Sequence, residues 1–255
     1  MKHYLLVVVI SYLFILAVVL FDRKFSVGMW REILTSSLLS LLQLILIGFA
    51  ILFFLNFKHP LINVLFVIFF YVNGSLIAFR RFRVSGYPKV STFLVVFLSI
   101  SLISSFSLLL LWLAGILKPK ANSVIPLAGI VTAAGMRSLS LAFKYFRTRL
   151  LDLEEIILGM AALGASDIEI FKFIFRQLID DITVPIRDML RSAGIVHIPG
   201  VMVGLLIAGV LPLKAAVIQF AILSVMVFQF TFVPALSLFL LVKRIGLKIP
   251  RGYSD

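Results

Sequence analysis

The sequence contains no cysteine, which excludes disulfide bonds, thiolate catalysis and cysteine-ligated metal centres. Histidine is also rare, because only His3, His59 and His197 occur, far apart along the chain. A tight transition-metal site needs several convergent ligands, and the residues show no such set. The ligands of any metal site therefore stay unknown at this stage.

Catalytic motifs are missing as well. The chain has neither an HExxH zinc motif nor a GxSxG nucleophile elbow, and it lacks the phosphate-binding P-loop GxxxxGK[ST]. We therefore expect this chain to be no enzyme by itself and to hold no cofactor. Any ATP hydrolysis that drives it must come from another polypeptide.

Charged residues are scarce. They make up 14% of the chain, whereas 62% of the residues are hydrophobic and the mean hydropathy is +1.17. A soluble domain, whose surface must be wet, is far less apolar. The length of 255 residues allows six or seven membrane spans of about 20 residues each. We predict an all-α, polytopic membrane helix bundle in the plasma (inner) membrane, with residues 1–255 forming a single transmembrane domain.

The charge that is present is mostly positive. The formal net charge of +13 would suggest a nucleic-acid partner in a soluble protein. In a polytopic protein, lysine and arginine more often anchor cytoplasmic loops beside anionic lipid. We therefore expect the lipid bilayer as a partner and no nucleic acid.

Seven apolar runs are long enough to be candidate spans. The first, Tyr4 to Phe21, has 18 residues and ends in Asp22, Arg23 and Lys24. A cleaved signal peptide has an apolar core of about 7 to 15 residues, so a retained span fits better. The other six runs are approximately Ile33–Leu55, Leu61–Phe79, Val90–Leu117, Val124–Phe143, Ile195–Leu213 and Ala215–Val242.

The distribution of lysine and arginine predicts the orientation of these spans. With the N-terminus outside, 18 of the 24 basic residues fall on the cytoplasmic side and five fall outside, with Arg137 left within a span. Cytoplasmic loops carry an excess of positive charge. We therefore predict the N-terminus outside and the C-terminus in the cytoplasm.

In this orientation the longest hydrophilic stretch, about residues 145–190, faces the cytoplasm, and it holds eight of the 11 acidic residues. Ser166 and Glu169 have the spacing of a capping box, and Gly164 can end a preceding helix because it tolerates a left-handed conformation. We expect one helix to stop near Leu163 and an amphipathic helix of about four turns to begin at Ser166.

The periodicity of this helix separates charged residues from apolar ones. The charged positions are Glu169, Lys172, Arg176 and Asp180, and the apolar stripe is Ile170, Phe171, Ile174, Phe175 and Leu178. Two roles fit this pattern. One is a helix that lies on the inner membrane surface, and the other is a docking helix for a cytoplasmic partner.

The segment "AALGAS" at 161–166, followed by an amphipathic helix, resembles the loop of ABC transporter permeases that forms a coupling helix against the ATPase subunit. Gly164 matches the glycine of that pattern, and Ile174 matches its isoleucine. Leu158 stands where the pattern has glutamate, and Arg176-Gln177 replace its Leu-Pro. The resemblance implies that an ATPase docks on the 164–180 helix.

A more specific resemblance covers roughly residues 122–230. The stretches "IPLAG" at 125–129, "LGAS" at 163–166 and "VPIRDMLRSAGIVHIPGVMVGLLIAGVLPLKAAVIQF" at 184–220 are similar to the FetB family of ABC permeases, linked to iron export and resistance to metal stress. Ala133-Ala134 stand where family members often have Gly-Asn, and His197 replaces a small residue. The ordered motif positions are Pro185, Asp188, Arg191, Gly194, Pro199, Gly200, Met202, Gly204, Ala208, Gly209 and Pro212.

This resemblance implies a permease subunit that exports iron, another metal ion or a small solute. It also implies a homodimer and a separate ABC ATPase that binds ATP and Mg²⁺. The residues expected to couple the two subunits are Leu163, Gly164, Ala165, Ser166, Asp167 and Glu169.

Polar and irregular positions within the spans are candidates for the translocation pathway. A guanidinium is costly in hydrocarbon, so Arg137 should pair, reach the headgroups or face the pathway. A helix break at Pro199-Gly200 would free backbone groups that need water or protein partners. The candidate pathway residues are Met136, Arg137, His197, Pro199, Gly200 and Met202.

Small residues four positions apart, Gly129 with Ala133 and Gly200 with Gly204, predict close helix packing. Two alternatives to the ABC permease stay open. A secondary transporter or channel would need no ATPase, although intramembrane acids for ion coupling are lacking. A membrane scaffold or assembly protein could use the cytoplasmic helix for docking without transport.

Overall fold

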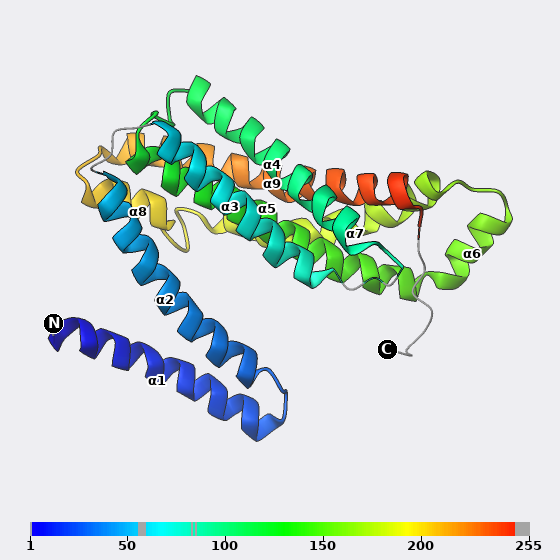
Figure 1. The fold of residues 1–255 in the computed structure, drawn as a ribbon, viewed down its shortest axis with the longest axis horizontal. Coiled ribbons are helices and arrows are strands. Elements are labelled where there is room, and N and C mark those ends of the chain that lie inside the picture. Colours follow the sequence, from blue (N-terminus) through cyan, green and yellow to red (C-terminus); the bar gives the residue numbers. More distant parts are fainter. Residues whose placement is uncertain (1, 56–59, 83, 85, 248–255) are drawn as a thin grey trace. The chain divides into compact units, whose positions relative to one another are not determined.

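The computed structural model describes residues 2–55, 60–82, 84 and 86–247 (Figure 1). Within these residues the chain is helical and forms no strand, which confirms the all-α prediction. His59 and four cations of the charge count, Lys58, Arg83, Lys248 and Arg251, lie outside the described residues. The chain divides into two units, Met1–Lys58 and His59–Asp255, and the single-domain expectation stays a prediction.

The first unit is a hairpin of α1 (Lys2–Phe25) and α2 (Trp30–Leu55). The carboxylate of Asp22 is buried and accepts hydrogen bonds from the backbone N–H groups of Met29 (3.0 Å) and Trp30 (2.9 Å). The first N–H groups of a helix have no partner within the helix, so Asp22 caps α2. The acid that follows the first apolar run thus fixes the turn of the hairpin.

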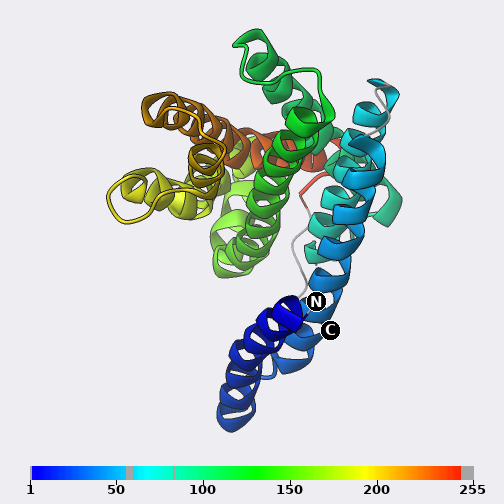
Figure 2. The same ribbon diagram turned by 90° about the vertical axis from the view of Figure 1, so that its left-hand side faces the viewer.

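The second unit contains α3 (Pro60–Arg81), α4 (Lys89–Leu113), α5 (Ala121–Asp152), α6 (Glu154–Ala162), α7 (Asp167–Ser192), α8 (Gly200–Ile207) and α9 (Pro212–Ile245). In this unit α3, α5 and α9 run in one direction, and α4 and α7 run in the other (Figure 1). Helix α5 packs against α3, α4, α7 and α9, and it lies between α3 and α9 in the turned view (Figure 2). It is therefore the central helix of the unit.

Small residues bring the neighbours of α5 close. A Cβ placed on Gly74 of α3 would lie 2.9 Å from Cγ2 of Thr132, and Gly129 faces the ring of Phe70. The close packing predicted around Gly129 therefore occurs within the chain, between α3 and α5. Among the described residues, apart from its chain neighbours and the nearby backbone of its own helix, nothing lies within 4 Å of a Cβ built on Gly200 or Gly204, so no close helix contact is described there.

A buried polar network joins α4, α5 and α9. The amide nitrogen of Gln229 donates to Oγ of Ser107 (2.9 Å), and Oγ of Ser104 donates to the amide oxygen (3.4 Å). The hydroxyl of Ser138 donates to the backbone oxygen of Gln229 (3.3 Å). The side chain of Gln229 is fully buried, so these bonds offset the desolvation of its amide.

Six helices within the described residues are long and apolar enough to cross a membrane, and the predicted count of seven is not confirmed. The run Ile195–Leu213 forms no single span but contains α8, which has only 8 residues. Gly194 and Gly209 adopt left-handed φ values of 83° and 79° on either side of α8, and such residues end regular helix. Pro212 then begins α9.

Candidate functional site

The turn between α6 and α7, residues 163–166, lies at one end of the second unit, and α8 lies at the other end (Figure 1). Leu163 ends α6, and Gly164 follows it in the left-handed region at φ 87°. Ser166 is the N-cap of α7. The predicted helix stop near Leu163 and the predicted start at Ser166 are confirmed.

The capping box at the start of α7 is complete. Oε2 of Glu169 accepts hydrogen bonds from the backbone N–H of Ser166 (2.8 Å) and from its hydroxyl (2.7 Å). The backbone N–H of Glu169 donates in return to Oγ of Ser166 (3.4 Å). The hydrogen bonds from Ser166, first from its backbone and then from its side chain, lower the pKa of Glu169 below its ordinary value. The turn is therefore ordered although it is exposed.

The α6–α7 turn presents an apolar side chain to solvent. Leu163 is 91% exposed, and Gly164 has no atom within 4 Å of a built Cβ. The other predicted coupling residues, Ala165, Ser166, Asp167 and Glu169, lie in the same turn or the first turn of α7. The structure thus brings all six predicted coupling residues together on one exposed feature.

A hydrogen bond and a salt bridge connect α7 to neighbouring segments. The carboxylate of Asp167 accepts a hydrogen bond from the backbone N–H of Leu247 (2.9 Å), just beyond the end of α9. A salt bridge of 3.0 Å joins Arg149 near the end of α5 to Asp181. Both contacts join residues far apart in sequence, and the sequence analysis did not identify them.

Helix α7 is longer than predicted, because it continues from Asp180 to Ser192. Ile182 and Ile186 extend the apolar stripe and are buried. The stripe packs on α5 and α9, so the interpretation of a helix lying on the membrane surface is wrong for this face. The packing of these side chains maintains the helix past Pro185, which has no N–H to donate. The predicted charged face, Glu169, Lys172, Arg176 and Asp180, is exposed.

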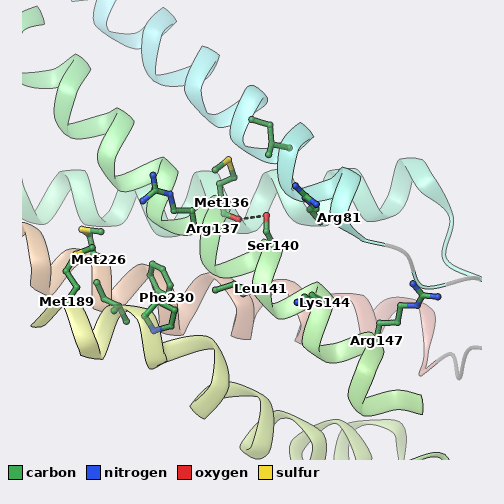
Figure 3. Close-up of a pocket in the computed structure, with 13 residues that line it drawn as sticks. Arg81, Met136, Arg137, Ser140, Leu141, Lys144, Arg147, Met189, Met226 and Phe230 are labelled. Atoms are coloured by element: carbon green, nitrogen blue, oxygen red, sulfur yellow. Dashed lines mark hydrogen bonds between the residues drawn. The ribbon is translucent and has the colours of Figure 1, made fainter. Parts of the chain in front are cut away.

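A cavity of about 640 Å³ lies among α3, α5, α7 and α9 (Figure 3). Its basic side chains are Arg81 at the end of α3 and Arg137, Lys144 and Arg147 on α5. Among the residues that the structure describes, no aspartate or glutamate lines it. The remaining lining residues are Ile77, Met136, Ser140, Leu141, Pro185, Ile186, Met189, Met226 and Phe230.

The three basic residues of α5 form a stripe. Steps of seven and three residues place Arg137, Lys144 and Arg147 on one face of a helix with 3.6 residues per turn. Ser140 lies on the same face, and its hydroxyl donates to the backbone oxygen of Met136 (2.8 Å; Figure 3). The spacing is visible in the sequence, but only the fold shows that this face lines a cavity.

The break between α7 and α8 covers residues 193–199. Oγ of Ser192 lies 3.2 Å from Nδ1 of His197, and the N–H of Gly194 donates to the carbonyl of His197 (2.9 Å). After Pro199, the N–H of Met202 in the first turn of α8 donates to the side-chain oxygen of Gln219 in α9 (3.1 Å). Gln219 is buried, and it satisfies a backbone group that the helix itself leaves unpaired.

The six predicted pathway residues therefore fall into two groups. Met136 and Arg137 line the cavity, whereas His197, Pro199, Gly200 and Met202 belong to the break and to the first turn of α8 and do not line it. Their role in transport stays a prediction. Within the described part of the chain, no group of three or more His, Asp or Glu side chains that could hold a metal ion occurs.

Comparison with known proteins gives a match over nearly the whole chain. Residues 5–245 match the model of the Uncharacterised protein family (UPF0014). The chain is 24% identical over 206 residues to "Probable iron export permease protein FetB" of Escherichia coli (strain K12), which covers 81% of the chain and 78% of that protein. No solved structure matches.

Two further relatives have similar coverage. The chain is 21% identical over 213 residues to "UPF0014 membrane protein YjkA" of Bacillus subtilis (strain 168), covering 84% of each chain. It is 25% identical over 214 residues to "Protein ALUMINUM SENSITIVE 3" of Arabidopsis thaliana, covering 84% of the chain and 77% of the relative. Together with the six apolar helices, the family match shows that the chain belongs to the UPF0014 family and is a multi-pass membrane permease.

Proposed function

We propose that this chain is the membrane subunit of an ABC exporter. In this proposal two copies of the chain form a homodimer, and two copies of a separate ATPase dock on their α6–α7 turns. The ATPase binds ATP and Mg²⁺, because the chain itself lacks a P-loop. Docking and hydrolysis then drive alternating access of the pathway to the two sides of the membrane.

The exposed α6–α7 turn is the observation that carries this proposal. Leu163 is 91% exposed at the tip of the turn, and a projecting apolar side chain is a suitable anchor for a pocket on a partner. The capping box and Gly164 hold the turn in one conformation, so docking costs little ordering entropy. These properties fit a docking element better than a simple connection.

The contacts of α7 provide a route from the turn to the cavity. From Ser166 to Pro185 the helix extends over about 29 Å, at about 1.5 Å per residue. Near the turn, Asp167 connects the helix by a hydrogen bond to the chain just beyond α9. Further along, Asp181 connects it by a salt bridge to α5. Pro185, Ile186 and Met189 of the same helix line the cavity. A displacement of the turn therefore acts on the cavity wall through one continuous helix.

The proposed cargo is iron or another metal ion, and the proposed direction is export. The names of two relatives support a role in metal handling, since one refers to iron export and the other to aluminum sensitivity. The resemblance of the segment 184–220 to the FetB pattern supports the same cargo. Loading vesicles with iron and measuring ATP-dependent release tests this part of the proposal separately from docking.

The docking proposal is tested by expressing the chain with its neighbouring reading frames and identifying what copurifies. The variant Gly164→Trp places a bulky side chain on the α6–α7 turn. Gly209→Trp is the matched control, because both glycines have a left-handed φ and no atom within 4 Å of a built Cβ. Gly209 lies beside α8, at the other end of the unit.

We expect an ATP-binding subunit to copurify with the unmodified chain. Gly164→Trp should reduce the amount that copurifies at least about tenfold, because the added indole obstructs the contact of the turn with its partner. Gly209→Trp should retain it. The proposal fails when no ATP-binding subunit is retained by the unmodified chain, or when both variants retain it equally.

A further inference from the structure

The cavity among α3, α5, α7 and α9 concentrates positive charge. Arg137, Lys144 and Arg147 line it from one face of α5, and Arg81 adds a fourth cation from α3. Arg147 lies ten residues beyond Arg137, so the three α5 cations are distributed along about 15 Å of the helix. Like charges on one face of a helix repel one another, and salt weakens this repulsion where water reaches them. An anion in the cavity would relieve that repulsion.

The acidic residues of α7 do not supply this anion. Asp181 is paired with Arg149 (3.0 Å), and Asp180 is paired with Arg187 (2.8 Å). Neither acid lines the cavity. Within the described residues no ion pair is found for the three cations of the α5 stripe, and all three are exposed to the cavity or to solvent.

The rest of the lining fits the uncharged part of a ligand. Met136, Met189, Met226 and Phe230 contribute apolar surface to the same cavity as the cations. Methionine side chains are flexible and adapt to different apolar groups. The hydroxyl of Ser140 already donates to a backbone oxygen of α5, so its proton is not available to a ligand. The cavity thus combines cationic donors with an adaptable apolar surface.

We propose that this cavity binds a phosphate-type oxyanion, contributed by an anionic lipid headgroup or by a soluble phosphate. Arginine binds such oxygens with paired N–H donors, and lysine binds them as a point charge. A bare divalent metal cation is the ligand that this cavity disfavours, since three cations of the same helix would repel it. The inference does not depend on the proposed ATPase, because binding requires only this chain.

The site is tested on the purified full-length chain by measuring its thermal unfolding. One series uses nanodiscs of phosphatidylcholine with inorganic phosphate added, and potassium chloride at equal ionic strength corrects for screening. A second series replaces part of the phosphatidylcholine with phosphatidylglycerol, without added phosphate. A ligand that binds only the folded protein raises its unfolding temperature.

Stabilisation in the first series identifies a soluble phosphate as the ligand, and stabilisation in the second alone identifies a lipid headgroup. The triple variant Arg137→Gln, Lys144→Gln, Arg147→Gln should raise the apparent Kd at least about tenfold, because it removes charge-assisted hydrogen bonds. The double variant Lys172→Gln, Arg176→Gln is the control, since both residues are exposed on α7 and do not line the cavity.

The single variants Lys144→Gln and Lys144→Arg keep the test valid in case the triple variant does not fold. Lys144→Gln should weaken the stabilisation, and Lys144→Arg should restore it because the positive charge returns. The proposal is overturned when neither series stabilises the unmodified chain, or when the control variants lose as much stabilisation as the cavity variants.

Discussion

The contact between α5 and α9 is tight enough for one added methyl group to destabilise the protein. A Cβ on Gly135 would lie 3.0 Å from the amide oxygen of Gln229 and 3.3 Å from Cγ2 of Val233. Gln229 is fully buried and bonded to Ser104 and Ser107, so its amide cannot move without weakening those bonds. The variant Gly135→Ala is therefore a direct test of this packing.

Three contributions set the expected magnitude. Overpacking a filled core costs about 1–3 kcal/mol. Interhelical hydrogen bonds in membrane proteins contribute about 0.6 kcal/mol each, so weakening two of them adds about 1 kcal/mol. Replacing glycine with alanine within a helix raises the free energy of unfolding by up to about 1 kcal/mol. The balance predicts that Gly135→Ala lowers the free energy of unfolding by about 1–3 kcal/mol.

The assay is reversible unfolding in mixed detergent micelles, with Gly48→Ala as the matched control. Gly48 lies within α2, and a built Cβ there meets no atom within 4 Å. This control should be neutral or slightly stabilising. In a Gln229→Ala background, where the amide is absent, Gly135→Ala should lower the free energy of unfolding by a smaller amount. Equal stability of Gly135→Ala and Gly48→Ala would refute the described contact between α5 and α9.

Two further predictions concern the ends of α8 and α7. Gln219→Leu should speed hydrogen exchange in the first turn of α8, because the N–H of Met202 loses its acceptor at a cost of about 1–3 kcal/mol. The control is Ser224→Ala, which should leave that exchange unchanged because the hydroxyl of Ser224 donates to the carbonyl of Phe220 within α9. The pKa of Glu169 is lowered in the folded protein. The stabilisation from its ionised carboxylate is therefore complete above the ordinary glutamate pKa of about 4.3, and it is lost as the pH falls through the lowered value. In a carboxyl-carbon NMR titration, Ser166→Ala should raise this pKa only part of the way, because the backbone hydrogen bond remains; an unchanged pKa would show that the hydroxyl contributes nothing.

Local chemistry explains what the sequence predicted well. The start of α7 depends on Ser166 and Glu169, which are three residues apart, and on Gly164 beside them. No distant residue is needed to form a capping box. The all-helical membrane class likewise follows from composition. The residues predicted to couple the subunits are neighbours in the sequence, so the fold also places them together; their role stays a prediction.

Long-range packing explains what the sequence did not predict. The length of α7 depends on Ile182 and Ile186 packing against other helices, although Pro185 and nearby charges interrupt the local pattern. The run Ile195–Leu213 is apolar enough to suggest a span, but only Gly200–Ile207 within it is helical, and the left-handed Gly209 follows that helix. Hydropathy averages over a window and does not detect such backbone changes.

The cavity was also beyond the sequence analysis. Arg137 was recognised as unusual within a span, and its heptad spacing to Lys144 was visible. Only the fold shows that Arg81 of α3 and Met189 of α7 line the same space. The buried amides of Gln219 and Gln229 gave no signal in the sequence, because their partners lie on other helices.

Site-specific crosslinking tests the central claim, that a separate ATPase docks on the α6–α7 turn. The chain contains no cysteine, so Leu163→Cys introduces a unique reactive site at a position that is 91% exposed. Leu211→Cys is the control, at a position that is 73% exposed beside α8. The account predicts that a cysteine-directed crosslinker joins an ATP-binding subunit to Leu163→Cys but not to Leu211→Cys. Crosslinking at neither position, or equally at both, would contradict it.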